Sequence, residues 1–324
     1  MKIGIMGAGK IAHTMAKTIL GMKNDDIILE AIGSRTITKA KEFQSLYGIP
    51  KAYGSYQELV QDKDIDLIYV ATPHSEHYDN AMLCLENKKN ILMEKPFTVN
   101  KKEAEAIFKE AKKEGLFVTE AIWTRYMPST RFLTHIIDSK IIGEVNSVQV
   151  NLGYKLTDIE RLINPNLAGG ALLDVGIYPL TFATLVFNSM PNFVDGECVK
   201  YETGVDASES VVLKFNNKLA SLHSTLLSKT DRHGYIYGSE GYLEVDNINN
   251  PMKINHYNNQ YELVEVVDFE PQITGFEYEV NACYNALKQN LLECKECPHA
   301  TTIKMMEIMD SLRNKWEIKY PFEK

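Results

Sequence analysis

The strongest constraint on the fold is an alternation of short apolar runs and amphipathic segments over residues 1–120. The amphipathic segments place apolar residues at helical spacing, whereas the runs are too short for most helices and are rich in Ile, Leu and Val. These runs lie at 2–6, 27–33, 66–71, 90–94 and 116–120. Apolar strands that alternate with helices form a parallel sheet with helices on both faces. Residues 1–120 are therefore predicted to form a doubly wound α/β (Rossmann) domain.

From residue 121 the pattern changes to short segments in which apolar and polar residues alternate. A period of two indicates strands with one buried face, and turns that contain Asn or Gly separate the segments. The turn signals lie at 215–218, 238–241 and 257–260. Residues 121–324 are therefore predicted to form an α+β domain with a large, mainly antiparallel open sheet. One face of this sheet has no obvious helical cover.

A G-x-G-x-x-A motif lies between the first apolar run and the first helix. Gly7 is expected to form the tight turn, and Gly9 to let a pyrophosphate approach the backbone. Ala12 allows close packing of helix and strand. Lys10 and Ile11 open the helix, whose N-terminus attracts phosphate. A glycine-rich turn alone is weak evidence, but this position in a βαβ pattern predicts a dinucleotide site.

The end of the second apolar run indicates which dinucleotide is bound. NAD sites usually offer Asp or Glu there to the ribose hydroxyls, but this run ends in Ser34 and Arg35. A serine hydroxyl and a guanidinium can instead hold a 2′-phosphate by charge-assisted hydrogen bonds. The alternative is that Arg35 is a surface arginine at a helix start. We predict NADP as the cofactor, with NAD as a possible substitute.

Ligands of doubly wound sheets bind at the carboxyl ends of the strands, and two strand ends here carry polar residues. The run that ends near residue 70 continues into Ala71, Thr72 and Pro73, with His77 close behind. All four are predicted to border the nicotinamide end of the cofactor. A histidine at a helix start is often only a cap, which is the alternative for His77.

The next strand end has the sequence Glu94-Lys95-Pro96. Lys95 is predicted to project towards the nicotinamide, with Glu94 beside it in the cofactor site. Pro96 stiffens the backbone behind the lysine, and the tight turn suggests a cis Lys95–Pro96 bond. The alternative is a solvated lysine that leaves a strand.

Four motifs together resemble the glucose–fructose oxidoreductase / inositol dehydrogenase (Gfo/Idh/MocA) family. They are the G-x-G-x-x-A, the E-K-P, an E-A-x-W-x-R-[FY]-x-P at 120–128, and the segment from Arg161 to Leu180 with its G-G-A-L-L-D-V-G-I-Y-P. The last two are similar to the branch of dimeric dihydrodiol dehydrogenases and NADP-dependent D-xylose dehydrogenases. The resemblance covers essentially the whole chain and implies a substrate-binding and oligomerisation role for residues 121–324.

The resemblance also implies a catalytic set. Many family members have D-x-x-x-H in the second domain, but this chain has Asp174 and Tyr178. In the dihydrodiol dehydrogenase branch this tyrosine acts with the motif lysine. A neighbouring ammonium lowers the pKa of a phenol, so Tyr178 would exchange the substrate proton while Lys95 stabilises the alkoxide. Asp174 would orient the substrate or keep Lys95 charged. The alternative for Tyr178 is a core aromatic residue.

Three further residues are candidates for substrate contact. Trp123 and Arg125 follow the last strand of the first domain and can cover the nicotinamide or a sugar and bind a hydroxyl or phosphate. Packing between the domains is the alternative for both. Tyr154, which follows the first strand segment of the second domain, is assigned to the substrate site.

Composition limits the partners. The net charge of −8 argues against nucleic acid and anionic membranes, and the apolar segment 171–187 contains Asp174 and Pro179, which favours a buried helix over a membrane span. Five cysteines are few and odd in number, as expected for free thiols in the cytoplasm. The isolated C-x-x-C at Cys294 and Cys297 has no second ligand pair, so no metal site is predicted.

These observations predict an NADP(H)-dependent oxidoreductase that transfers hydride between nicotinamide and a secondary alcohol or carbonyl of a sugar, polyol or cyclic trans-diol. Two alternatives stay open. A dinucleotide sensor without activity would be expected to lack Lys95 or Tyr178, and an NAD-dependent glycosidase would not need Ser34 and Arg35. The uncovered sheet face, which pairs subunits in relatives, predicts a homodimer or larger homo-oligomer.

Overall fold

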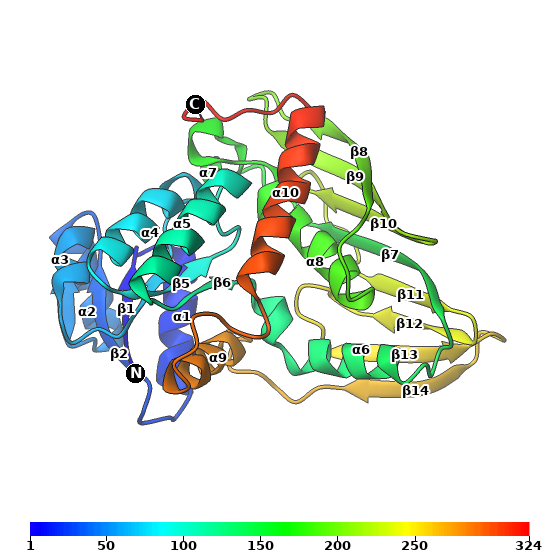
Figure 1. Ribbon diagram of the computed structural model, residues 1–324, viewed down its shortest axis with the longest axis horizontal. Helices are drawn as coiled ribbons and strands as arrows, with labels where there is room; N and C mark the ends of the chain where they lie inside the picture. The colour runs from blue at the N-terminus through cyan, green and yellow to red at the C-terminus, as the bar shows by residue number, and fades with distance from the viewer. Residues whose placement is uncertain (324) are drawn as a thin grey trace. The chain divides into compact units, whose positions relative to one another are not determined.

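The computed structural model describes residues 1–323 and divides into two compact units (Figure 1). The first unit contains Met1–Trp123 together with Gln272–Ile303, and the second contains Thr124–Pro271 together with the C-terminal segment from Lys304. The sequence analysis expected two contiguous domains, 1–120 and 121–324, whereas in the structure residues 272–303 belong to the first unit. This segment returns to the first unit because α9 (Glu277–Lys288) packs against α1 (Lys10–Gly21).

The first unit is built on a six-stranded parallel sheet, as predicted. Its strand order is β3-β2-β1-β4-β5-β6, which is the order of a doubly wound dinucleotide-binding sheet. The strands are β1 (Lys2–Met6), β2 (Ile28–Gly33), β3 (Lys51–Tyr53), β4 (Leu67–Val70), β5 (Asn90–Glu94) and β6 (Val118–Ala121). The chain reverses direction across the sheet between β1 and β4, and the carboxyl edge at that switch point is where a dinucleotide binds.

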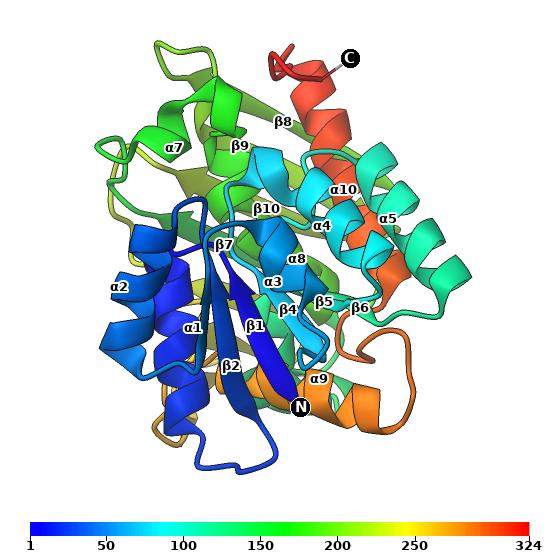
Figure 2. The same ribbon diagram turned by 90° about the vertical axis from the view of Figure 1, so that its left-hand side faces the viewer.

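Helices cover both faces of this sheet. Besides α1 and α9, they are α2 (Ile37–Tyr47), α3 (Tyr56–Gln61), α4 (His77–Glu86) and α5 (Lys101–Glu114). In Figure 2, α4 and α5 lie on one side of the strands, and α1 and α9 lie on the other. All four residues of β4 are fully buried, as expected for a strand covered on both faces. Asn100 caps α5 by accepting a hydrogen bond from the Glu103 backbone N–H.

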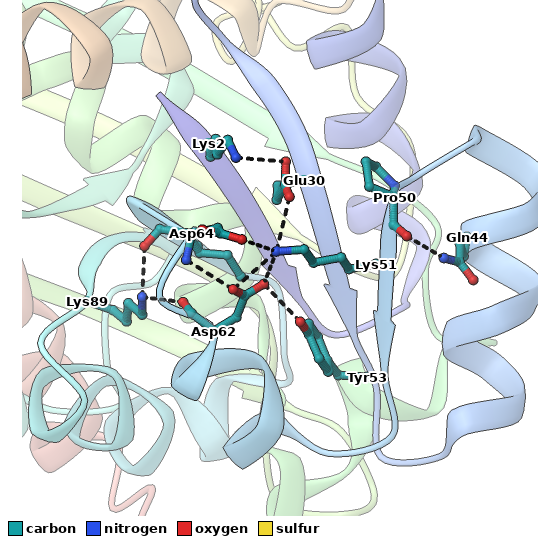
Figure 3. Close-up of polar contacts among 10 residues, drawn as sticks. Lys2, Glu30, Gln44, Pro50, Lys51, Tyr53, Asp62, Asp64 and Lys89 are labelled. Atoms are coloured by element: carbon teal, nitrogen blue, oxygen red, sulfur yellow. Dashed lines mark hydrogen bonds and ion pairs between the residues drawn. The ribbon is translucent and has the colours of Figure 1, made fainter.

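A charged cluster ties together the amino ends of several strands in this unit (Figure 3). The Lys51 ammonium lies 3.2 Å from the Glu30 carboxylate, 2.9 Å from that of Asp62 and 2.6 Å from that of Asp64. Asp62 also accepts a hydrogen bond from the Tyr53 hydroxyl at 2.9 Å. Because ligands bind at the opposite, carboxyl edge, we interpret this cluster as structural.

The second unit contains an eight-stranded sheet in the order β14-β13-β12-β11-β7-β10-β9-β8. All neighbours are antiparallel except β7 and β10, which confirms the predicted mainly antiparallel sheet. The strands are β7 (Val145–Gly153), β8 (Phe193–Lys200), β9 (Asp206–Phe215), β10 (Lys218–Thr225), β11 (Gly234–Gly238), β12 (Gly241–Val245), β13 (Lys253–Asn258) and β14 (Leu263–Asp268). The helices are α6 (Pro128–Asp138), α7 (Glu160–Ile163), α8 (Ile177–Val186) and α10 (His299–Lys315), the last of which begins in the first unit.

Only one face of this sheet carries helices among the described residues, with α6 and α8 against it (Figure 1). On the other face, neighbouring strands bring tyrosines into contact: the rings of Tyr242 and Tyr257 stack with centroids 4.7 Å apart. Val212 and Leu219 are 43% and 51% exposed. The apolar segment Pro165–Val186 is long enough to span a membrane, but 94% of its most apolar window is buried, so it forms the core of this unit.

Candidate active site

The glycine-rich turn between β1 and α1 has the geometry expected of a dinucleotide site. Gly7 has φ +105°, and a Cβ there would lie 2.7 Å from the Ala71 carbonyl oxygen, so only glycine fits. Gly9 is the N-cap of α1, and a Cβ at this position would meet nothing within 4 Å. Lys10 and Ile11 form the first turn of the helix, and Ala12 is fully buried. The open helix N-terminus fits a pyrophosphate.

The end of β2 carries no acidic side chain. The Ser34 backbone N–H donates to the Tyr53 carbonyl oxygen at 3.1 Å, which fixes the loop, and Arg35 is exposed. Partial burial raises the pKa of the nearby Tyr56 hydroxyl, and the positive charge of Arg35 opposes that increase. A guanidinium at this position is suited to an adenosine 2′-phosphate.

His77 joins the loops that follow β4 and β5. Its Nδ1 lies 2.9 Å from the Pro96 carbonyl oxygen and its Nε2 lies 3.0 Å from the Thr72 carbonyl oxygen. The Thr72 hydroxyl accepts a further hydrogen bond from Asn80 Nδ2 at 3.0 Å. Since the His77 side chain is fully buried, its role in the structure is to hold the two loops together. The contact of His77, Ala71, Thr72 and Pro73 with a cofactor stays a prediction.

Lys95 follows β5 at the carboxyl edge of the sheet, and the Lys95–Pro96 bond is cis, as predicted. The Glu94 carboxylate is buried beneath this turn. It accepts hydrogen bonds from the Tyr69 hydroxyl and, at 3.2 Å, from the Lys95 backbone N–H. Glu94 therefore holds the start of the turn that presents Lys95, and we assign it a structural part in addition to the predicted cofactor contact.

The turn behind Lys95 has an anchor that the sequence analysis did not identify. The buried Glu120 carboxylate accepts hydrogen bonds from the Phe97 backbone N–H at 3.0 Å and from the Thr302 hydroxyl at 2.8 Å. Glu120 lies on β6 and opens the E-A-x-W motif. The sequence signal for this role was a carboxylate at the end of an apolar run, inside the E-A-x-W motif. Its hydrogen-bond partners could not be identified from the sequence because they are distant along the chain.

In the second unit, Asp174 and Tyr178 lie on one continuous helical segment. The sequence predicted a regular helix, but Leu172–Gly176 is a π-helical turn that leads directly into α8. Both side chains are buried. Asp174 forms an ion pair with Arg161, whose Nη1 lies 3.0 Å from the Asp174 Oδ1. The sequence analysis quoted Arg161 within a motif but did not assign it this partner.

Two of the three remaining predicted substrate residues, Trp123 and Tyr154, contact residues of their own units. The Trp123 ring is half-buried and stacks on Phe276 of the same unit with centroids 4.6 Å apart. Arg125 lies in the 3₁₀ turn Trp123–Tyr126 and is partly exposed. The Tyr154 hydroxyl donates to Asn249 at 3.3 Å. The structure does not test the predicted substrate contacts of these three residues.

Family models match both parts of the chain. Residues 1–122 match the model described as "Oxidoreductase family, NAD-binding Rossmann fold", and residues 130–244 match the "GFO/IDH/MocA C-terminal domain". Similar curated proteins include the trans-1,2-dihydrobenzene-1,2-diol dehydrogenases of Xenopus tropicalis and Mus musculus. The first is 33% identical over 99% of both chains, and the second is 30% identical over 100% of this chain and 99% of its own.

Solved structures show the same fold at lower sequence identity. The 3-ketoreductase KijD10 from Actinomadura kijaniata, in complex with NADP and TDP-benzene, has a TM-score of 0.86 at 21% identity over 97% of both chains. The aldose-aldose oxidoreductase from Caulobacter crescentus, complexed with glycerol, has a TM-score of 0.88 at 19% identity over 98% of this chain and 97% of its own. With both domain models matched and full-length relatives above 30% identity, the chain belongs to the Gfo/Idh/MocA family of NAD(P)-dependent oxidoreductases.

Proposed function

We propose that the protein catalyses NADP(H)-dependent hydride transfer between nicotinamide and a secondary alcohol or carbonyl of a cyclic trans-diol, sugar or polyol. The observation that carries this proposal is the position of Lys95. It is the strand-end cation at the carboxyl edge of a dinucleotide-binding sheet, and buried hydrogen bonds to Glu94, Glu120 and His77 fix the turn on both sides of it. A solvated surface lysine would not need such support.

The choice of NADP follows from the end of β2. Arg35 offers a permanent positive charge to a 2′-phosphate, and Ser34 adds a hydroxyl, whereas a carboxylate for the free ribose hydroxyls of NAD is missing there. KijD10, which shares the fold, was solved with NADP. NAD is expected to bind more weakly because its ribose leaves the guanidinium without an anionic partner.

In the proposed mechanism, Lys95 and Tyr178 have different roles. Bound NADP⁺ would supply the acceptor for the hydride that leaves the carbinol carbon. Tyr178 takes the hydroxyl proton, and the Lys95 ammonium stabilises the negative charge that develops on the same oxygen. Asp174, held by its ion pair with Arg161, orients the substrate. In the reverse direction Tyr178 returns the proton to the carbonyl oxygen.

The test is a substrate panel with NADP⁺ reduction as the readout. trans-1,2-Dihydrodiols are the first class to assay because the curated relatives are named for them, followed by aldoses and polyols. Turnover with any of these classes supports the proposal. Tight NADPH binding without turnover on the whole panel would instead support a dinucleotide sensor, and release of an aglycone from a glycoside would support glycosidase chemistry.

We also propose that two copies of the chain pair through the uncovered face of the large sheet. Val212 on β9 and Leu219 on β10 are exposed there, and β7 separates these two strands from the tyrosine-rich strands β11, β12 and β13 of the same sheet. Sedimentation at micromolar concentration is expected to show a dimer or larger oligomer. Leu219→Glu should shift that equilibrium towards the monomer, and a monomeric wild-type protein would contradict the proposal.

A further inference from the structure

Two carboxyl groups are buried together beneath the π-helical turn of the second unit. Asp206 and Glu209 both lie on β9 and are 0% and 3% exposed. Residues three apart on a regular strand face opposite sides. Here the register with β8 shifts, so that Val199 pairs with Ser208 and Lys200 with Asp206, and the additional residue turns both carboxyls to the same side.

Both carboxyls press against glycines that border the π-helical turn. A Cβ at Gly170 would lie 2.3 Å from Asp206 Oδ1, and a Cβ at Gly176 would lie 2.1 Å from Glu209 Oε1. The Leu172 backbone N–H, at the start of the turn, donates to Asp206 Oδ2 at 2.5 Å. The carboxyl pair therefore contacts the turn at its start and at its end, and these contacts account for Gly170 and Gly176 of the motif around Asp174.

Three oxygens of this pair have no hydrogen-bond partner among the described residues 1–323: Asp206 Oδ1, Glu209 Oε1 and Glu209 Oε2. Two ionised carboxylates buried side by side would repel each other and would lack solvation. One proton between them removes the repulsion and supplies the missing hydrogen bond. Since Asp206 already accepts a backbone N–H, which favours its ionised form, the proton belongs on Glu209.

Neighbouring groups do not replace this proton. Arg313, on α10, forms ion pairs with Glu323 at 2.8 Å and with Asp310 at 3.2 Å. The buried Tyr320 hydroxyl donates to the Gly169 carbonyl oxygen at 2.8 Å. The Cys198 thiol on β8 carries no charge at neutral pH. The Ser224 hydroxyl, which lies opposite Glu209 on β10, favours the ionised form of Glu209, but burial and the charge of Asp206 outweigh this effect on its pKa.

We propose that Glu209 is held protonated and donates a hydrogen bond to Asp206, and that this pair positions the π-helical turn that carries Asp174 and leads into Tyr178. Burial raises the pKa of Asp206, and burial together with the charge of Asp206 raises that of Glu209 well above its usual range. Asp206 and Glu209 are positioning residues. Their effect on turnover rests on the proposed function, but the shared proton does not.

The first test is infrared difference spectroscopy of the full chain. Wild-type protein at pH 7 is expected to show the C=O band of a protonated carboxylic acid, and Glu209→Gln should remove a component of it. Glu202→Gln, an exposed glutamate in the turn before β9, is the matched control and should leave the band unchanged. A band of unchanged intensity in Glu209→Gln would overturn the proposal, since the buried Glu279, whose pKa is also raised by burial, contributes a component of its own.

The second test is the pH dependence of stability. A carboxyl whose folded pKa is raised makes the folded state less stable as pH rises above the unfolded value of about 4.3. Glu209→Gln should therefore make the downward slope of the melting temperature between about pH 5 and 7 less steep, and Glu202→Gln should leave it as in the wild type. Identical slopes for wild type and Glu209→Gln would overturn the proposal.

Activity distinguishes this inference from the proposed function. Glu209→Leu removes the hydrogen bond and is expected to lower kcat by on the order of 10²-fold with unchanged NADPH affinity. Glu209→Gln, whose amide can donate to Asp206 as the acid does, should restore most of that loss. If Tyr178→Phe keeps full turnover, the proposed function fails, whereas the infrared band and the pH slope still decide whether the proton is shared.

Discussion

Glu120 accepts a hydrogen bond from the backbone N–H of Phe97 at 3.0 Å and thereby ties β6 to the turn that presents Lys95. The Phe97 amide lies two residues after the lysine, so this contact limits how far the turn can move. The other Glu120 oxygen accepts from Thr302, which belongs to the segment that returns to the first unit. One carboxylate therefore joins three distant parts of the chain.

The first prediction concerns this anchor. Glu120→Ala leaves the Phe97 amide and the Thr302 hydroxyl without their acceptor in a buried site, which costs about 1–3 kcal/mol of unfolding free energy. It should also lower kcat because Lys95 is less well oriented. Urea unfolding and steady-state kinetics measure the two effects. Glu105→Ala on the exposed side of α5 is the control, with an ion pair at 3.7 Å that should matter little. Equal behaviour of the two variants would contradict the prediction.

The second prediction concerns the catalytic pair. Lys95→Met removes the charge that stabilises the alkoxide, and Tyr178→Phe removes the proton acceptor, so each should lower kcat by about 10²–10⁴-fold. NADPH affinity, measured by fluorescence titration, should change little. Tyr261→Phe, at a side chain that is 80% exposed, is the control for Tyr178. Turnover near the wild-type rate in either catalytic variant would exclude the proposed mechanism.

The third prediction concerns cofactor choice. Arg35→Glu replaces the proposed 2′-phosphate ligand by a repelling charge. It should lower the preference for NADP over NAD, as a ratio of kcat/KM values, by about tenfold or more, since one charge-assisted hydrogen bond accounts for that much. Lys39→Glu makes the same charge change at an exposed position on α2. A ratio that is unaffected by Arg35→Glu would assign the arginine to the surface.

The strand-end residues could be predicted because the carboxyl ends of neighbouring parallel strands meet at one edge. This placed Lys95 after β5 and the Ala71–Pro73 segment after β4 without any knowledge of side-chain contacts. The parts that could not be predicted depend on long-range partners. The packing of α9 on α1 joins segments more than 250 residues apart, and helical periodicity alone does not say which sheet a helix covers.

The π-helical turn at Leu172–Gly176 is a second feature that the sequence could not predict, because its contacts are with residues distant in the chain. Periodicity predicted a regular helix around Asp174, since one additional residue in a turn barely alters an apolar pattern. Asp206 and Glu209 contact this turn from β9, yet they appear in the sequence as two ordinary polar residues of a strand. Likewise, Arg161 could be quoted as part of a motif, but its ion pair with Asp174 required the fold.

The last prediction concerns the charged cluster at the amino ends of the first sheet. Partial burial alone would raise the pKa of Asp62, but the hydrogen bond from Lys51, with others from Asp64 and Tyr53, lowers it. A carboxyl with a lowered folded pKa adds stability above the unfolded value of about 3.9, and this stability is lost as pH falls through the folded pKa. Asp62→Asn should therefore lower the melting temperature at pH 7 and flatten its decline below about pH 4. Asp25→Asn, at an exposed aspartate between α1 and β2, is the control. If the melting temperature of Asp62→Asn declined at low pH as steeply as that of the wild type, Lys51 would not stabilise the fold through Asp62.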